Sequence, residues 1–139
     1  MNANEKKEIK SVLKLKNLYF ENISFNRDKT LPDELETKFE TKYKDINDSE
    51  IEVKLICYVK SKSFELTLSL VGEFENTEQD KEIREEINHI NTISIMFPYM
   101  RAELSLITAQ PNFPTIDLPI VNINALLAND GKLCAKKYK

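Results

Sequence analysis

Apolar and polar side chains alternate along most of the first half of the chain. From Ile51 to Val59 every second residue is apolar, and after a short polar turn the same pattern runs from Phe64 to Phe74. A period of two is typical of strands with one buried face, and the turn between the two runs predicts a hairpin. Gly72 inside the second run predicts a bulge or a close backbone approach.

Two earlier runs predict two more strands. Between Leu35 and Tyr43, apolar residues and threonine alternate with Glu and Lys, which indicates a half-buried strand with one charged face. Residues 9–25 alternate less regularly, and the phase changes near Lys16, which predicts a long strand with a bulge. The polar stretch 26–33 between these two runs is expected to be a surface crossover.

The pattern changes to a helical period after residue 76. Asn76 or Thr77 is expected to cap a first helix. The apolar side of this helix is formed by three isoleucines, Ile83, Ile87 and Ile90. The next apolar segment keeps helical spacing through Pro98, although proline lacks the backbone donor that a helix interior uses.

Residues 109–122 contain three prolines, and we call this segment the Pro-rich connection. The prolines are Pro111, Pro114 and Pro119. Each proline disfavours helical geometry in its predecessor, so this connection is expected to be stiff and extended. Asn122 is expected to cap a short helix that reaches Leu127. The Lys-rich tail is expected to be a solvated end.

Strands followed by helices predict an α+β fold, in which C-terminal helices cover one face of a four-stranded antiparallel sheet. No repeat or linker divides the chain, so we expect one domain over residues 1–139. The sheet is expected at about 9–76, the helices and Pro-rich connection at about 77–129, and the basic tail at 130–139.

Composition excludes several classes of function. The net charge is −3 and 31% of the residues are charged, with both signs nearly balanced, which argues against a nucleic-acid-binding surface. No apolar run approaches the roughly 20 residues that a membrane helix needs, and the amino terminus is too polar for a signal peptide. We therefore expect a cytoplasmic protein without membrane insertion.

Catalytic and metal-binding chemistry lacks candidates in the sequence. Two glycines are too few for a Gly-rich phosphate loop, and His89 is the single histidine. Cys57 and Cys134 have no metal-ligand spacing, and we interpret them as reduced thiols. The sequence therefore predicts a protein that is not an enzyme and needs no cofactor or metal.

The second half of the chain carries a family resemblance. The run FPYMRAEL, residues 97–104, is followed in order by Phe-Pro, Leu-Pro, Val-Asn and Ala-Leu, the last at residues 125–126. These anchors resemble the C-terminal half of SecB, the bacterial export chaperone. The resemblance implies a homotetramer, built as a dimer of dimers, that holds secretory precursors unfolded without an ATPase of its own.

A holdase needs exposed apolar surface in a groove, beside charges that keep the complex soluble. The sequence offers eight candidates for client binding: Phe39, Tyr43, Phe64, Phe74, Phe97, Tyr99, Met100 and Phe113. Each of them alone is more readily explained as a core residue. Only the whole set, taken with the resemblance, favours a binding surface.

One stretch departs from the family pattern. The resemblance implies acids near the end of the first strand that help to dock the export motor SecA, and Asn22 and Asn26 stand in their place. Loss of two charges weakens the expected docking. Three functions therefore stay open: a holdase for secretory precursors, a SecB-like chaperone of an antitoxin in a toxin–antitoxin module, and an oligomeric scaffold that has lost client binding.

Overall fold

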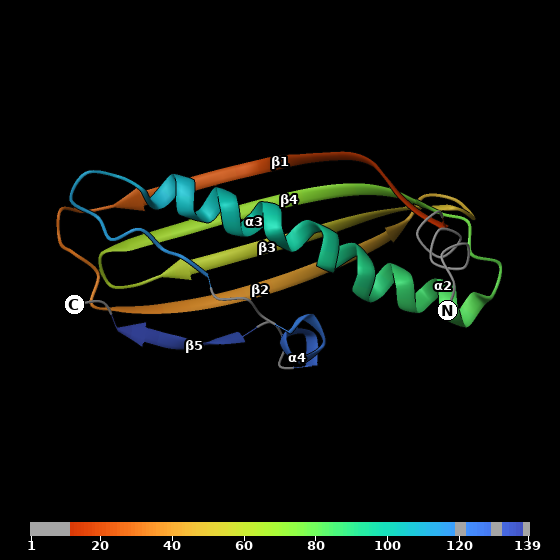
Figure 1. The fold of residues 1–139 in the computed structure, drawn as a ribbon. Helices are drawn as coiled ribbons and strands as arrows, with labels where there is room; N and C mark the ends of the chain where they lie inside the picture. The colour runs from red at the N-terminus through yellow and green to blue at the C-terminus, as the bar shows by residue number, and fades with distance from the viewer. Residues whose placement is uncertain (1–11, 119–121, 129–131, 138–139) are drawn as a thin grey trace, which may run out of the picture.

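The computed structural model describes residues 12–118, 122–128 and 132–137. One antiparallel sheet has the strand order β1-β4-β3-β2-β5. The strands are β1 (Leu13–Arg27), β2 (Glu34–Asp45), β3 (Glu50–Lys60), β4 (Phe64–Asn76) and β5 (Lys132–Lys137). The four long strands β1 to β4 confirm the predicted four-stranded sheet (Figure 1).

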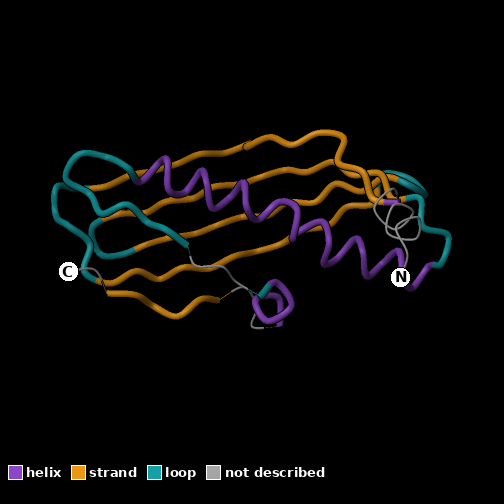
Figure 2. The backbone as a smooth tube through the Cα atoms, in the orientation of Figure 1, coloured by secondary structure: helices purple, strands orange, loops and turns teal. Residues whose placement is uncertain are grey.

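Helices form a second layer over one face of the sheet. They are α2 (Lys81–Glu86), the π-helical turn η1 (Ile87–Asn91), α3 (Thr92–Thr108) and α4 (Ile123–Ala128). The tube in Figure 2 shows α3 running obliquely across the strands, and Pro98 lies inside it. The predicted α+β arrangement is confirmed. No helix in the described ranges is long and apolar enough to cross a membrane.

The core lies between α3 and the covered face of the sheet. Ile93, Met96, Met100 and Leu104 are all fully buried, and their spacing of three or four residues makes one continuous side of α3. These side chains pack against alternate residues of β3 and β4, such as Leu55, in a single apolar cluster. The Pro-rich connection adds Ile116 and Leu118 to the same cluster, and α4 adds Leu126.

Two register shifts keep β1 in phase with this core. The predicted bulge is confirmed between Leu15 and Asn17, and a second shift, which the pattern did not reveal, lies between Phe20 and Asn22. Since each inserted residue reverses the alternation, Leu15, Leu18 and Phe20 can all pack against the covered face.

The basic tail is not the solvated end that we expected. Residues 132–137 form β5, which pairs with β2 from Glu34↔Lys137 to Lys38↔Lys132. Without β5, this edge of β2 would expose a row of backbone donors and acceptors, which an extended segment of almost any sequence can satisfy. Such pairing uses the backbone, so the sequence of the tail carried no pattern that predicted it.

The first helix is capped differently from our expectation. Asp80 is its N-cap, and its carboxylate accepts hydrogen bonds from the amides of Glu82 and Ile83 at 3.0 and 3.2 Å. Asn76 is instead buried, and its side-chain amide donates to Asn88 Oδ1 at 2.8 Å. Burial of a polar side chain with its bonds satisfied ties the helical layer to the end of β4. The predicted cap at Asn122 is confirmed by the bond from Ala125 N to its side-chain oxygen, 3.1 Å.

Gly72 marks a close approach of side chains rather than a bulge. The register of β4 with both neighbours runs through Gly72 without a shift. A Cβ atom built at this position would lie 2.6 Å from Phe74 Cε2 and 3.0 Å from Met96 Sδ. Both contacting residues are fully buried, so neither can move away freely.

We expect Gly72→Ala to lower the free energy of unfolding by about 1–3 kcal/mol, because the new methyl group overpacks the core between Phe74 and Met96. Chemical denaturation measures this change. The control is Thr67→Ala on the open face of the same strand, which should change the stability by less than about 0.5 kcal/mol. A Gly72→Ala protein that is more stable than the parent, as strand propensity alone would favour, contradicts this account.

Candidate functional site

Six of the eight predicted client-binding residues lie in the hydrophobic core: Phe39, Phe64, Phe74, Phe97, Met100 and Phe113. The ring of Phe39 packs against that of Phe97 with centroids 5.3 Å apart, which joins β2 to α3. In this structure the six side chains contact one another and the core. Their contact with a client stays a prediction.

An aromatic cluster fixes the Pro-rich connection to one end of the sheet. Phe113 packs edge-on against Phe25 and Phe64, with centroids 5.2 and 5.0 Å apart. The Arg27 guanidinium lies 4.8 Å from the Phe113 ring centroid and donates to the carbonyl of Pro111 at 3.2 Å. Aromatic packing and a cation over a ring are each favourable, so this end of the connection is held in place.

Helix α3 holds the rest of the connection through side-chain hydrogen bonds. Thr108 Oγ1 accepts from Ile116 N at 2.8 Å and donates to the carbonyl of Leu104 at 2.7 Å. Arg101 Nε donates to the carbonyl of Leu118 at 3.2 Å. These bonds support the expected stiff connection as far as residue 118, whereas Pro119 lies outside the described residues.

The two remaining predicted residues, Tyr43 and Tyr99, are partly accessible. The Tyr43 ring stacks on His89 with centroids 4.4 Å apart, and its hydroxyl donates to the His89 carbonyl at 2.8 Å. Burial raises the pKa of Tyr43, so its phenol remains a protonated donor at neutral pH. Tyr99 is 51% exposed on the outer side of α3.

Tyr99 belongs to an apolar stripe on the side of α3 that faces away from the sheet. The stripe consists of Ile95, Tyr99, Ala102 and Leu106, which follow one another at intervals of four, three and four residues. Leu106 is 67% exposed, whereas Ile95 is half-buried and packs in part against the core. We call these four residues the outer stripe of α3. An exposed stripe of this kind is typical of a surface that another protein covers.

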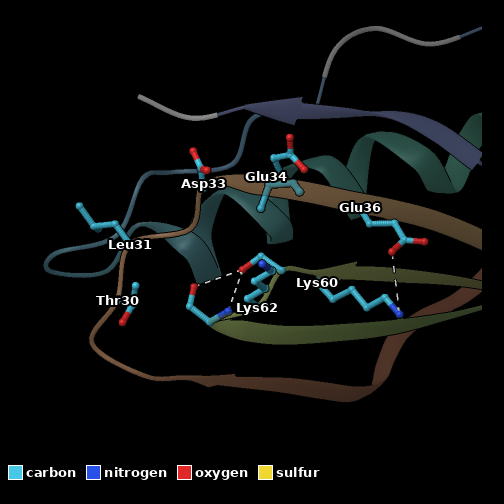
Figure 3. Close-up of a pocket in the computed structure, with 10 residues that line it drawn as sticks. Thr30, Leu31, Asp33, Glu34, Glu36, Lys60 and Lys62 are labelled. Carbon is cyan, nitrogen blue, oxygen red and sulfur yellow. Dashed lines mark hydrogen bonds and ion pairs between the residues drawn. The ribbon is translucent and has the colours of Figure 1, made fainter.

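Sequence reasoning missed a groove at the end of the sheet, which we call the crossover groove. It has a volume of about 690 Å³, within the usual range for ligand sites. One wall comes from the β1–β2 crossover and the start of β2, and the other from the β3–β4 turn. The lining residues are Thr30, Leu31, Asp33, Glu34, Leu35, Glu36, Lys60, Ser61, Lys62 and Ser63 (Figure 3).

Backbone hydrogen bonds position the two walls of the crossover groove. Asp28 N donates to the carbonyl of Ser63 at 2.9 Å, which joins the crossover to the β3–β4 turn. The Asp28 carboxylate then accepts from Thr30 N at 2.7 Å and fixes the start of the crossover loop. Across the groove Lys60 and Glu36 form an exposed ion pair at 3.9 Å. The geometry of the groove is therefore set mainly by the backbone.

The lining of the crossover groove combines apolar contact with solvated charge. Leu35 is buried, Leu31 is 55% exposed, and acids and lysines surround them. The signal available in the sequence was Leu31 itself, an apolar residue next to Pro32 in an otherwise polar crossover. A site of this composition can receive apolar side chains while it remains hydrated at its rim.

Potential metal ligands and the thiol of Cys57 are further candidates for chemistry. Among the described residues no three His, Cys, Asp or Glu side chains are placed to hold a metal ion. Cys57 is fully buried, and burial raises the pKa of its thiol to about 12, so the thiol stays protonated at neutral pH.

Asn22 and Asn26 both lie exposed on β1. Glu21 precedes Asn22 on the same strand. Its carboxylate forms an ion pair with Lys54 at 3.1 Å and accepts a hydrogen bond from Ser69 Oγ at 2.9 Å. These two partners lower the pKa of Glu21, Lys54 most strongly. The nearest acid on this part of β1 is therefore already paired, and the role of the two asparagines in motor docking stays a prediction.

The chain is similar to known proteins in both sequence and fold. The family model described as preprotein translocase subunit SecB matches residues 4–132. An uncharacterized protein of Methanocaldococcus jannaschii is 38% identical over 64 residues, which cover 46% of this chain and 41% of that protein. The match thus spans well under half of the length of that relative.

A solved structure is also similar. It is the SecB-like chaperone Rv1957 of Mycobacterium tuberculosis in complex with a ChAD peptide from the Rv1956 HigA1 antitoxin. The TM-score is 0.64 at 12% identity, and the match covers 84% of this chain and 95% of that one. At this identity the similarity concerns the fold.

Proposed function

This chain belongs to the SecB family, and we propose that it is an ATP-independent holdase of the cytoplasm. It binds unfolded polypeptides, chiefly secretory precursors, and keeps them competent for translocation. The observation that carries this proposal is the crossover groove, an accessible cavity lined by Leu31 and Leu35 among charges. The groove suits a holdase because it offers apolar contact without a shape that demands one particular side chain.

An extended client supplies side chains to the groove and backbone groups to the sheet. The groove is lined by Glu34, Leu35 and Glu36 at the beginning of β2, so a chain that runs along β2 passes it. Main-chain pairing with a strand gives affinity that depends little on sequence, while side-chain pockets add preference. This combination fits a protein that has to accept many unfolded clients.

We propose that the protein assembles as a homotetramer, a dimer of dimers, through two further surfaces. The first is the outer edge of β1, which is the terminal strand of the described sheet over its full length, Leu13–Arg27. Two such edges can pair around a twofold axis into a continuous sheet. The second is the outer stripe of α3, whose apolar residues pack against the same stripe of another dimer.

The residues predicted for client contact divide between these surfaces. Tyr99 belongs to the assembly surface, since it lies on the outer stripe of α3. The six core residues contact clients only after the helical layer or the Pro-rich connection moves, because those segments cover them. Tyr43 is partly accessible already, although its ring stacks on His89. The crossover groove is therefore the first contact in our proposal, and the aromatic set is a second contact that becomes available on rearrangement.

A specific observation favours a second candidate function, protection of an antitoxin. The structural neighbour Rv1957 is in complex with an antitoxin peptide. In addition, Asn22 and Asn26 replace the acids that the family resemblance implies for SecA docking, and neutral amides provide no long-range attraction. We propose that docking to SecA is weak, whichever client the protein serves.

Client binding should delay the refolding of a slowly folding protein in the absence of nucleotide. We expect Leu31→Asp to weaken the affinity for such a client roughly fivefold, because it removes about 1 kcal/mol of apolar contact at the groove. Tryptophan fluorescence of the refolding client measures the delay, since this chain has no tryptophan.

The matched control for that measurement is Ile46→Asp. Ile46 is 52% exposed, nearly the same as Leu31, but it follows the other end of β2. It should leave client affinity unchanged. Undisturbed refolding with several clients would rule out the holdase, and equal losses in the two variants would rule out the crossover groove as the site.

Assembly through the outer stripe of α3 predicts that Tyr99→Glu combined with Leu106→Glu converts the tetramer into a dimer, because four helices cannot bury the added charges. Light scattering in solution measures the mass. Ile83→Glu is the control, since Ile83 is similarly exposed, at 47%, but lies on α2. An unchanged mass in the double variant contradicts the role of the stripe, and a wild-type dimer or monomer contradicts the tetramer.

The antitoxin alternative predicts a toxin–antitoxin pair encoded beside this gene. The antitoxin should accumulate in soluble form only when it is co-produced with this chain, because the holdase covers its aggregation-prone segment. Fractionation of soluble and insoluble protein measures this dependence. A gene neighbourhood without such a pair, together with measurable binding to SecA, favours the export function.

A further inference from the structure

Strand β2 has two very unequal neighbours. On one side β3 pairs with it continuously from Glu36↔Lys60 to Asp45↔Ile51. On the other side β5 pairs only with the segment from Glu34 to Lys38, and the register is interrupted between Leu35 and Thr37. This part of the β2 edge is thus occupied by a short strand from the C-terminal end of the described chain.

The pairing of β5 has features of a strand that is easily released. It is six residues long, lies at the edge of the sheet, and has β2 as its one partner strand in the described topology. Its pairing with β2 is interrupted between Leu35 and Thr37, so the ladder of the two strands is not continuous. A short, interrupted, terminal strand is marginal by itself, so its release costs little.

The edge that β5 occupies is continuous with the crossover groove. Glu34 and Leu35 both line the groove and pair with β5, at Lys137 and Lys136 respectively. Figure 3 shows β5 passing beside Asp33 and Glu34 at this end of β2. A polypeptide that replaced β5 would therefore lie along the groove, with its side chains beside Leu31 and Leu35.

We propose that β5 is an internal occupant of the client-binding edge, displaced when an extended segment of an unfolded polypeptide pairs with residues 34–38 of β2. This inference rests on the proposed holdase function and adds the regulation of its site. The exchange replaces one set of backbone hydrogen bonds by an equivalent set, so it is nearly balanced whatever the sequence of the client. Without a client, β5 protects the edge from pairing with other chains.

Internal occupancy reduces the apparent affinity for clients by the fraction of molecules whose edge is free. If β5 occupies the edge in about nine molecules of ten, removal of its pairing strengthens client binding about tenfold. Competition with β5 for the edge of β2 favours clients that present a long extended segment, because only such clients gain contacts beyond the length of β5.

The experiment compares two double variants within β5. Leu133→Pro with Lys136→Pro removes two backbone donors at paired positions, whereas Leu133→Ala with Lys136→Ala keeps the donors and makes the same change in charge. The probe is a fluorescently labelled, reduced and carboxymethylated protein that cannot fold, and anisotropy gives its Kd. We expect about tenfold tighter binding by the proline variant and a change of less than about twofold in the alanine variant.

A second measurement remains decisive if the proline variant does not fold, which circular dichroism reports. A synthetic peptide of residues 132–137 should compete with the labelled client for the wild-type protein, while a scrambled peptide of the same composition competes less. Equal or weaker client binding by a folded proline variant overturns the inference, as does a peptide that fails to compete. In those cases client binding by the wild type still supports the holdase, whereas no binding by any form overturns both proposals.

Discussion

One long helix has to cover one face of the whole four-stranded sheet, and this requirement governs the rest of the structure. The buried side of α3 supplies Ile93, Met96, Met100 and Leu104, and none of the described helices covers the opposite face of the sheet. Burial of apolar surface is the main favourable term in folding, and the large side chains on the inner side of α3 are all packed into this one interface. The Pro-rich connection is drawn in as well, through Ile116 and Leu118.

The open face of the sheet is stabilised in another way. Val71 and Ile56 lie on it yet are buried, with 0% and 7% of their surface exposed. Ion pairs lie on this face: Lys54–Glu21 joins β3 to β1 at 3.1 Å, and Lys42–Glu40 lies along β2 at 3.8 Å. Such exposed pairs add little stability each, but they keep this part of the face polar. Our proposals accordingly place binding at the edges of the sheet, at the crossover groove and on the outer stripe of α3.

The outer edges of β1 and β2, the two outermost of the four long strands, are important for function for the same physical reason. The outer edge of β1 and the outer edge of β2 each present backbone groups that need partners. In our proposals a second copy of the chain satisfies β1, whereas β2 is satisfied in turn by β5 and by a client. The crossover groove lies where β2 begins and the core ends, so apolar contact and backbone pairing are available at one place.

The sequence by itself determined the elements whose pattern reflects burial. The alternation from Ile51 to Phe74 predicted the β3–β4 hairpin, the change of phase near Lys16 predicted the first bulge, and Asn122 predicted its cap. These features could be predicted because a period of two or of 3.6 residues is imposed by one buried side. The FPYMRAEL anchors added the family, which the match over residues 4–132 bears out.

Only the tertiary structure decided which apolar residues remain accessible. Phe39 and Phe97 have the composition of a binding site, yet they face each other across the core, while Leu31 in a polar crossover lines the groove. The sequence likewise did not predict the π-helical turn, the hydrogen bond from buried Asn76 to Asn88 or the pairing of β5 with β2. Periodicity reports that one side of an element is covered, but what covers it depends on contacts between segments far apart in the chain. Backbone pairing at an edge leaves no mark on the side chains, and for this reason the sequence could not reveal the place of the tail.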